Sequence, residues 1–117
     1  MPNPFVHLEL NTPDLDKAKE FYGQMFGWSF TDMPNPGGIY STFKPDSGPG
    51  GGLMTMPDAP AGWGAYIGVD DIKAATAKAI SLGATAIYAN HEIPNVGWMT
   101  LLVDPTGARI NLFQPKM

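Results

Sequence analysis

One order of elements occurs twice along this chain: a strand, a helix that ends at a glycine, and further strands. Residues 5–10 alternate between two kinds of side chain, which is typical of a strand. A helix is predicted next, with Thr12 as its cap, Pro13 in its first turn and Gly27 at its end. Further strands are predicted over residues 28–33, 39–44 and 51–56, with a turn over residues 34–38 between the first two of them.

The second half repeats this order after a proline-containing linker, residues 58–62. A strand is predicted over residues 64–69, followed by a helix that begins at Asp70-Asp71 and ends at Gly83. Residues 89–97 are predicted to form a long loop. The remaining strands are predicted over residues 84–88, 98–103 and 109–114.

Single positions correspond between the halves as well, because Asp14 and Leu15 align with Asp71 and Ile72 at one constant spacing. The repeat predicts an α+β fold of two tandem βαβββ modules. Module one covers residues 3–57, module two covers residues 63–115, and both lie in a single domain spanning residues 1–117.

Charge and composition argue against several classes of binding partner. The chain has 117 residues, a formal net charge of −4 and no cluster of basic side chains, which argues against nucleic acid. No apolar run is long enough to cross a bilayer, and no signal peptide is recognised at the N-terminus. Cysteine is absent, which excludes disulfides and thiolate metal sites. We therefore expect a cytoplasmic protein that contacts neither nucleic acid nor membrane.

Several short motifs carry a family resemblance that covers nearly the whole chain. They are His7-Leu-Glu-Leu, Thr12-Pro-Asp-Leu, Phe26-Gly-Trp, Tyr66-Ile-Gly-Val-Asp-Asp and Asp104-Pro-Thr-Gly. In combination they resemble the vicinal-oxygen-chelate superfamily, which includes glyoxalase I, bleomycin-resistance proteins and extradiol dioxygenases. The resemblance implies two βαβββ modules whose curved sheets form a ligand-binding cleft, often in a homodimer.

Enzymes of this superfamily bind a divalent metal through four side chains on the first and last strands of the modules, usually two His and two Glu. His7 matches the first position, while the second falls on Leu53 or Met54 and the third on Gly64. The fourth falls on Asn111, an amide in place of a carboxylate. Because only His7 is retained, no cofactor is expected, and a divalent metal is disfavoured.

Bleomycin-resistance proteins offer a metal-free precedent, since they share the fold and bind planar compounds. The leading interpretation is therefore a metal-independent protein that binds a small aromatic or hydrophobic molecule, with polar handles at His7, Glu9 and Asn111. Aromatic and methionine side chains complete the predicted site. They are Tyr40, Met54, Trp63, Tyr66, Trp98 and Phe113.

Two other interpretations remain open. One is a glyoxalase-like lyase or isomerase that holds a metal with an unusual set, such as His7, Glu9 and His91 of the predicted 89–97 loop. The other is a non-catalytic subunit whose aromatic surface meets another protein. No arrangement of nucleophile and base could be identified, so no catalytic residue is assigned.

Overall fold

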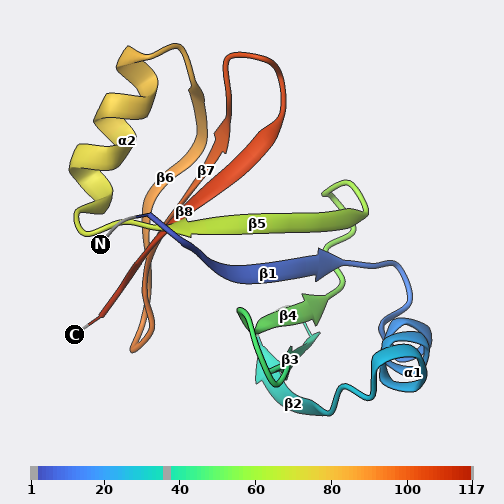
Figure 1. The fold of residues 1–117 in the computed structure, drawn as a ribbon. Helices are drawn as coiled ribbons and strands as arrows, with labels where there is room; N and C mark the ends of the chain where they lie inside the picture. Colours follow the sequence, from blue (N-terminus) through green and yellow to red (C-terminus); the bar gives the residue numbers. More distant parts are fainter. Residues whose placement is uncertain (1–2, 36–37, 117) are drawn as a thin grey trace. The chain divides into compact units, whose positions relative to one another are not determined.

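The computed structural model describes residues 3–35 and 38–116, and these contain eight strands and two helices (Figure 1). They fall in the predicted order, so the α+β class and the βαβββ succession in each half are confirmed. The first half contains β1 (Phe5–Asn11), α1 (Leu15–Phe26), β2 (Phe30–Asn35), β3 (Gly38–Phe43) and β4 (Gly51–Met54). The second half contains β5 (Gly62–Gly68), α2 (Ile72–Ser81), β6 (Thr85–Ile93), β7 (Gly97–Val103) and β8 (Arg109–Pro115).

The chain divides into two compact units, each with its own core. The N-terminal unit is His7–Trp63, and the C-terminal unit combines Met1–Val6 with Gly64–Met117. The predicted organisation as one domain, with a linker at residues 58–62, stays a prediction. No helix in the described part of the chain is long and apolar enough to cross a membrane.

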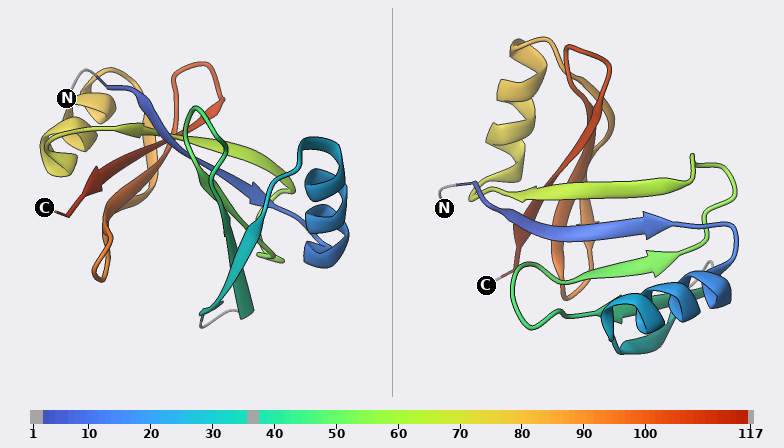
Figure 2. Two further views of the ribbon diagram at one scale, coloured as in Figure 1. Left: turned by 60° about the horizontal axis from the view of Figure 1, so that its bottom comes forward. Right: turned by 45° about the vertical axis from the view of Figure 1, so that its right-hand side comes forward.

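In the N-terminal unit the strands run in the order β2-β3-β4-β1. Strands β1 and β4 pair in parallel, with Leu10 opposite Leu53, and the other neighbours pair antiparallel. Helix α1 lies on one face of this sheet (Figure 2). Its Leu15, Ala18 and Tyr22 contact a core that includes Phe43. That helix therefore leaves the opposite face of the sheet uncovered within this unit.

Helix α1 begins two residues later than the sequence predicts, and a different residue caps it. Its N-cap is Asp14, whose carboxylate accepts a hydrogen bond from the Lys17 backbone N–H, so the assignment of the cap to Thr12 was wrong. Thr12 instead accepts a hydrogen bond from the Asp14 backbone N–H, and Pro13 precedes the helix. The end of the helix is as predicted, because Gly27 adopts the left-handed conformation with φ of 72°.

In the C-terminal unit the strands run in the order β5-β8-β7-β6, with β5 parallel to β8. Helix α2 is capped by Asp71, as predicted, and lies against β6, β7 and β8 (Figure 1). Its Ile72 packs with Val69, Leu102 and Leu112 to form the core of this unit. Each unit is thus a four-stranded sheet with a helix on one face.

The predicted loop over residues 89–97 was wrong, because β6 continues through most of it to Ile93. The strand pairs with β7 but shifts register twice, between Ala86 and Tyr88 and between Tyr88 and His91. At the second shift Asn90 has φ of 55°, and its backbone N–H donates to the buried Thr100 hydroxyl. These bulges break the alternation of side chains, so the sequence pattern did not resemble a strand.

The hairpin of β2 and β3 is also shifted from its prediction. Strand β2 begins at Phe30 rather than Trp28 and continues to Asn35, so the turn predicted to begin at Pro34 was placed too early. Gly38, the last residue of that predicted turn, pairs with Asn35 as the first residue of β3, and residues 36–37 lie outside the described residues.

Loss of Asp104 is expected to destabilise the fold at neutral pH and to have little effect in acid. The Asp104 carboxylate accepts hydrogen bonds from the Thr106 hydroxyl and from the backbone N–H groups of Ala108 and Thr106, and these lower its pKa below the ordinary 3.8. A lowered pKa in the folded state gives stability that is present above the unfolded pKa and lost as pH falls through the folded pKa.

Asp104→Ala should therefore lower Tm by a few degrees at pH 7, measured by thermal unfolding, and this difference should shrink as pH falls below 3.8. Asp58→Ala removes an exposed carboxylate from a turn and serves as the control. A difference for Asp104→Ala that is the same at pH 7 and in acid would contradict the assigned role of the carboxylate.

Candidate functional site

Side chains alternate between the two faces of the N-terminal sheet, and this alternation defines the candidate site. Leu10 on β1 is buried beneath α1, so His7 and Glu9 lie on the opposite face, as predicted. The register places Gly52 of β4 beside Glu9, and Tyr40 of β3 reaches across to the same face. We call this side of the sheet the open face of the N-terminal unit.

His7, Tyr40 and Glu9 form one hydrogen-bonded group on the open face. The Tyr40 hydroxyl donates to Glu9 Oε2 at 2.9 Å and lies 3.0 Å from His7 Nε2. His7 Nε2 and Glu9 Oε2 are 3.5 Å apart. The His7 side chain is 32% exposed and that of Glu9 is 18% exposed, so the group is partly shielded from water.

The direction of these hydrogen bonds sets the tautomer of His7. A carboxylate only accepts, so the single phenolic proton of Tyr40 goes to Glu9. The Tyr40 oxygen is then left to accept from His7, which requires the proton of the imidazole to be on Nε2. The two hydrogen bonds therefore form one chain, in which the imidazole N–H donates to the phenol oxygen and the phenol O–H donates to the carboxylate.

Gly52 makes room for the phenol of Tyr40. A Cβ atom at position 52 would lie 2.1 Å from the Tyr40 hydroxyl oxygen and 2.2 Å from the ring carbon that bears it. No side chain fits there, so only glycine allows Tyr40 to lie flat on β4 and reach both His7 and Glu9.

The register also decides between the two candidates for the second metal position of the family. Leu53 lies opposite Leu10 and is completely buried in the core beneath α1. Met54 lies opposite Asn11, on the open face with Tyr40 and Glu9. Met54 therefore borders the hydrogen-bonded group, whereas Leu53 is a core residue.

Trp63, another predicted contact, lies elsewhere in the N-terminal unit. Its indole N–H donates to the Tyr22 hydroxyl of α1 at 3.1 Å, and its ring packs edge-on against Phe43 of the core. Phe43 in turn stacks on Trp28 with ring centroids 4.4 Å apart. Trp63 thus belongs to an aromatic cluster on the α1 side of the sheet and not to the open face.

In the C-terminal unit the structure separates Trp98 from the other predicted site residues. Tyr66 pairs with Asn111, and both are largely buried on the face away from α2, with Phe113 two residues further along β8. Trp98 packs on the opposite face, against the core beneath α2. Trp98 thus lies on the helix-covered face of its unit, whereas Tyr40 lies on the face of its own unit that α1 leaves uncovered.

His91, considered above as a metal ligand, lies on β6 in the C-terminal unit. Its Nδ1 is 2.9 Å from the Tyr88 hydroxyl, and the two rings pack with centroids 4.7 Å apart. Both side chains are exposed. Among the described residues, His7 and His91 thus each contact a tyrosine, and the contact of His7 also includes the carboxylate of Glu9.

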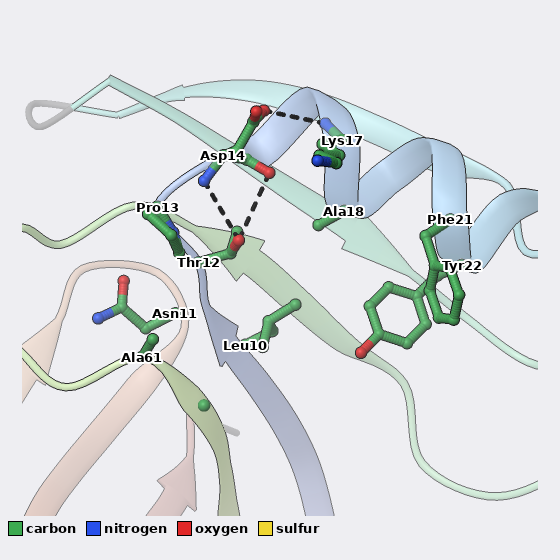
Figure 3. A pocket seen from close by; sticks show the side chains of 11 residues that line it. Leu10, Asn11, Thr12, Pro13, Asp14, Lys17, Ala18, Phe21, Tyr22 and Ala61 are labelled. Atoms are coloured by element: carbon green, nitrogen blue, oxygen red, sulfur yellow. Dashed lines mark hydrogen bonds between the residues drawn. The ribbon is translucent and has the colours of Figure 1, made fainter.

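A shallow groove of about 530 Å³ lies at the start of α1 (Figure 3). It is mostly apolar and contains none of the predicted site residues. In Figure 3 the Asp14 carboxylate points to the first turn of the helix, and Phe21 and Tyr22 lie further along α1. The residues lining it are Leu10, Asn11, Thr12, Pro13, Asp14, Lys17, Ala18, Phe21, Tyr22, Ala61 and Gly62.

The described residues do not fit the divalent metal centre that the family resemblance implies. Residues 3–35 and 38–116 contain no group of three or more His, Cys, Asp or Glu side chains that could hold an ion. At His7 the metal-binding atoms of the imidazole and of Glu9 are hydrogen-bonded to Tyr40, and the adjacent Gly52 offers no donor. The thioether of Met54 is a weak ligand for hard or borderline ions.

The part of the site that sequence reasoning missed is Gly52. Residues 48–52 include four glycines, and such a run is typical of a strand entry that another group approaches closely. That interpretation is confirmed in kind, because Gly51 and Gly52 each lie against neighbouring groups that would clash with a side chain. The sequence contained no signal that the group approaching Gly52 is the phenol of Tyr40.

Comparisons with known proteins agree with this architecture. The family profile described as "Glyoxalase-like domain" matches residues 7–113. The chain is 36% identical over 114 residues to "Putative glyoxylase CFP32" of Mycobacterium tuberculosis, covering 92% of this chain and 44% of that protein. It is 30% identical over 127 residues to the anthracycline biosynthesis protein DnrV of Streptomyces peucetius, covering 92% of this chain and 45% of the relative.

Solved structures share the fold at low sequence identity. Methylmalonyl-CoA epimerase from Mycobacterium tuberculosis superposes with a TM-score of 0.73 at 20% identity, covering 97% of this chain and 88% of the other. A hypothetical protein, BH1468 from Bacillus halodurans, gives 0.77 at 14% identity, covering 100% of this chain and 97% of the other.

This protein therefore belongs to the glyoxalase-like domain family, within the vicinal-oxygen-chelate superfamily. The chain spans less than half the length of the curated relatives it matches.

Proposed function

We propose that this protein binds a small organic molecule, aromatic or hydrophobic in character, on the open face of its N-terminal unit without a metal ion. The observation that carries the proposal is the His7–Tyr40–Glu9 group, which combines a hydrogen-bonding network with an aromatic ring. Met54 borders this group and offers an adaptable apolar contact. An apolar surface with a few fixed polar groups is the usual design of a small-molecule site.

The family membership supports the same proposal in general terms. One curated relative is named for anthracycline biosynthesis. The chain matches less than half of that protein, so the relative supports a class of ligand and not a particular compound. Tyr66, Asn111 and Phe113 of the C-terminal unit stay predicted contacts, and homodimer formation also stays a prediction. Trp63 and Trp98 lie on the helix-covered faces of their units, and the proposed open-face site does not use them.

Binding should be tested by equilibrium titration of a panel of aromatic and polycyclic compounds, in the presence of a chelator. We expect saturable binding, and His7→Ala should weaken it about tenfold or more because a hydrogen bond to a charged or polarised group is lost. His91→Ala is the matched control, since it removes the other histidine–tyrosine contact. Its affinity should stay within about twofold of the unchanged protein.

Two results would count against the proposal. The first is a flat response across the panel. The second is an equal loss of affinity in His7→Ala and His91→Ala, because the ligand would then not depend on the open face.

The alternative function is a glyoxalase-like lyase or isomerase that uses a metal held by His7, Glu9 and a third ligand. The membership of the chain in a glyoxalase-like family motivates this alternative. The lack of three or more grouped His, Cys, Asp or Glu side chains among the described residues argues against it. Elemental analysis of protein purified without chelator decides between the two. One metal equivalent per chain, lost in His7→Ala, would favour the enzyme.

A further inference from the structure

The hydroxyl of Tyr40 occupies the point at which two potential metal ligands converge. His7 Nε2 and Glu9 Oε2 are 3.5 Å apart. Two ligand atoms each about 2.1 Å from one ion at a tetrahedral angle would be about 3.4 Å apart. The separation of the two atoms thus suits a chelated transition-metal ion, yet both atoms bind Tyr40 instead.

We infer that Tyr40 is the specificity-determining residue that keeps divalent transition-metal ions out of the His7–Glu9 pair. This inference rests on the proposed metal-free function, and it gives a structural reason why the His7–Glu9 pair binds no metal. A metal ligand nitrogen must offer a lone pair, but Tyr40 holds the His7 proton on Nε2. An ion chelated by His7 Nε2 and Glu9 Oε2 would also have to take the oxygen to which the phenol donates.

Gly52 makes this exclusion possible. The hydroxyl lies within 2.1 Å of the place where a Cβ atom at position 52 would be, so the phenol needs the absence of a side chain there. An ion that binds to the pair would have to break both hydrogen bonds and displace an aromatic ring packed on β4. Both steps oppose binding, although the pair itself has suitable spacing.

Removing the phenol should therefore create a metal site. In Tyr40→Ala both hydrogen bonds to the phenol are lost, and the small residues at positions 40 and 52 leave space for an ion and its water ligands. We expect Co²⁺ and Zn²⁺ to bind Tyr40→Ala about tenfold or more tightly than the unchanged protein, because imidazole and carboxylate together suit these ions.

Calorimetric titration with Zn²⁺ and visible absorption of Co²⁺ measure this gain. Tyr88→Ala is the matched control, because it removes a phenol from His91, which has no acidic partner in the same contact. Tyr88→Ala should gain no affinity. The double variants His7→Ala/Tyr40→Ala and Glu9→Gln/Tyr40→Ala should lose the gain, which would locate the ion at the pair.

A second measurement is independent of whether Tyr40→Ala folds. Nitrogen NMR of the unchanged protein at pH 8 should show a proton on Nε2 of the His7 ring, and Tyr40→Phe, which keeps the ring, should lose this preference. An Nε2 without a proton in the unchanged protein would overturn the inference, as would a folded Tyr40→Ala that gains no metal affinity.

These outcomes separate the inference from the proposed function. If the unchanged protein binds Zn²⁺ as tightly as Tyr40→Ala, and His7→Ala abolishes this binding, both the exclusion and the metal-free function fail. If Tyr40→Ala gains nothing while ligand titration of the unchanged protein succeeds, only the role of Tyr40 is wrong.

Discussion

Gly52→Ala is expected to weaken ligand binding on the open face while leaving the fold largely intact. The added methyl group would lie 2.1 Å from the Tyr40 hydroxyl oxygen, so the phenol must swing away from β4 and lose both His7 and Glu9. Because the clash involves a side chain that can rotate, the free energy of unfolding should fall by about 1–3 kcal/mol at most. Ligand affinity should fall about tenfold or more, as in His7→Ala.

Gly23→Ala is the matched control for this substitution. Gly23 lies within α1, and a Cβ atom there would be 3.5 Å from its nearest neighbour, an ordinary contact. Alanine in a helix is favoured over glycine by about 0.5–1 kcal/mol, so this variant should be at least as stable as the unchanged protein. Unimpaired ligand binding in Gly52→Ala would contradict the proposed site.

Leu53→Ala is expected to have the largest effect on stability. Leu53 is completely buried, in a core with Leu10 and Phe43 beneath α1. Removal of its side chain should lower the free energy of unfolding by about 2–5 kcal/mol, because the core loses apolar contact and keeps a cavity. Chemical denaturation followed by circular dichroism measures this loss.

Met54→Ala tests the register at the adjacent position. Met54 lies on the open face and is only half-buried, so the free energy of unfolding should fall by less than about 1.5 kcal/mol. Its ligand affinity should fall instead. A larger stability loss for Met54→Ala than for Leu53→Ala would mean that β4 presents the opposite face to α1.

Local sequence patterns predicted strands and helices correctly where the periodicity of apolar residues agreed with the capping and turn residues at the ends. The alternation in β1 predicted both the strand and the face that carries His7 and Glu9, and Gly27 predicted the end of α1. Prediction was wrong where tertiary contacts override the pattern. In β6 the bulges near Asn90 interrupt the alternation of side chains, so a strand resembled a loop.

The sequence by itself determined the βαβββ succession, because that order depends on periodicity, caps and turns that lie close together along the chain. The sequence also determined that the other three metal-ligand positions of the family, apart from His7, hold no imidazole or carboxylate. Only the tertiary structure decided what His7 contacts. Tyr40 comes from a strand 33 residues away and reaches His7 because β3, β4 and β1 are neighbours and Gly52 leaves the surface between them open. Such a contact depends on the register between strands and on the absence of a side chain, and neither can be predicted from a local pattern.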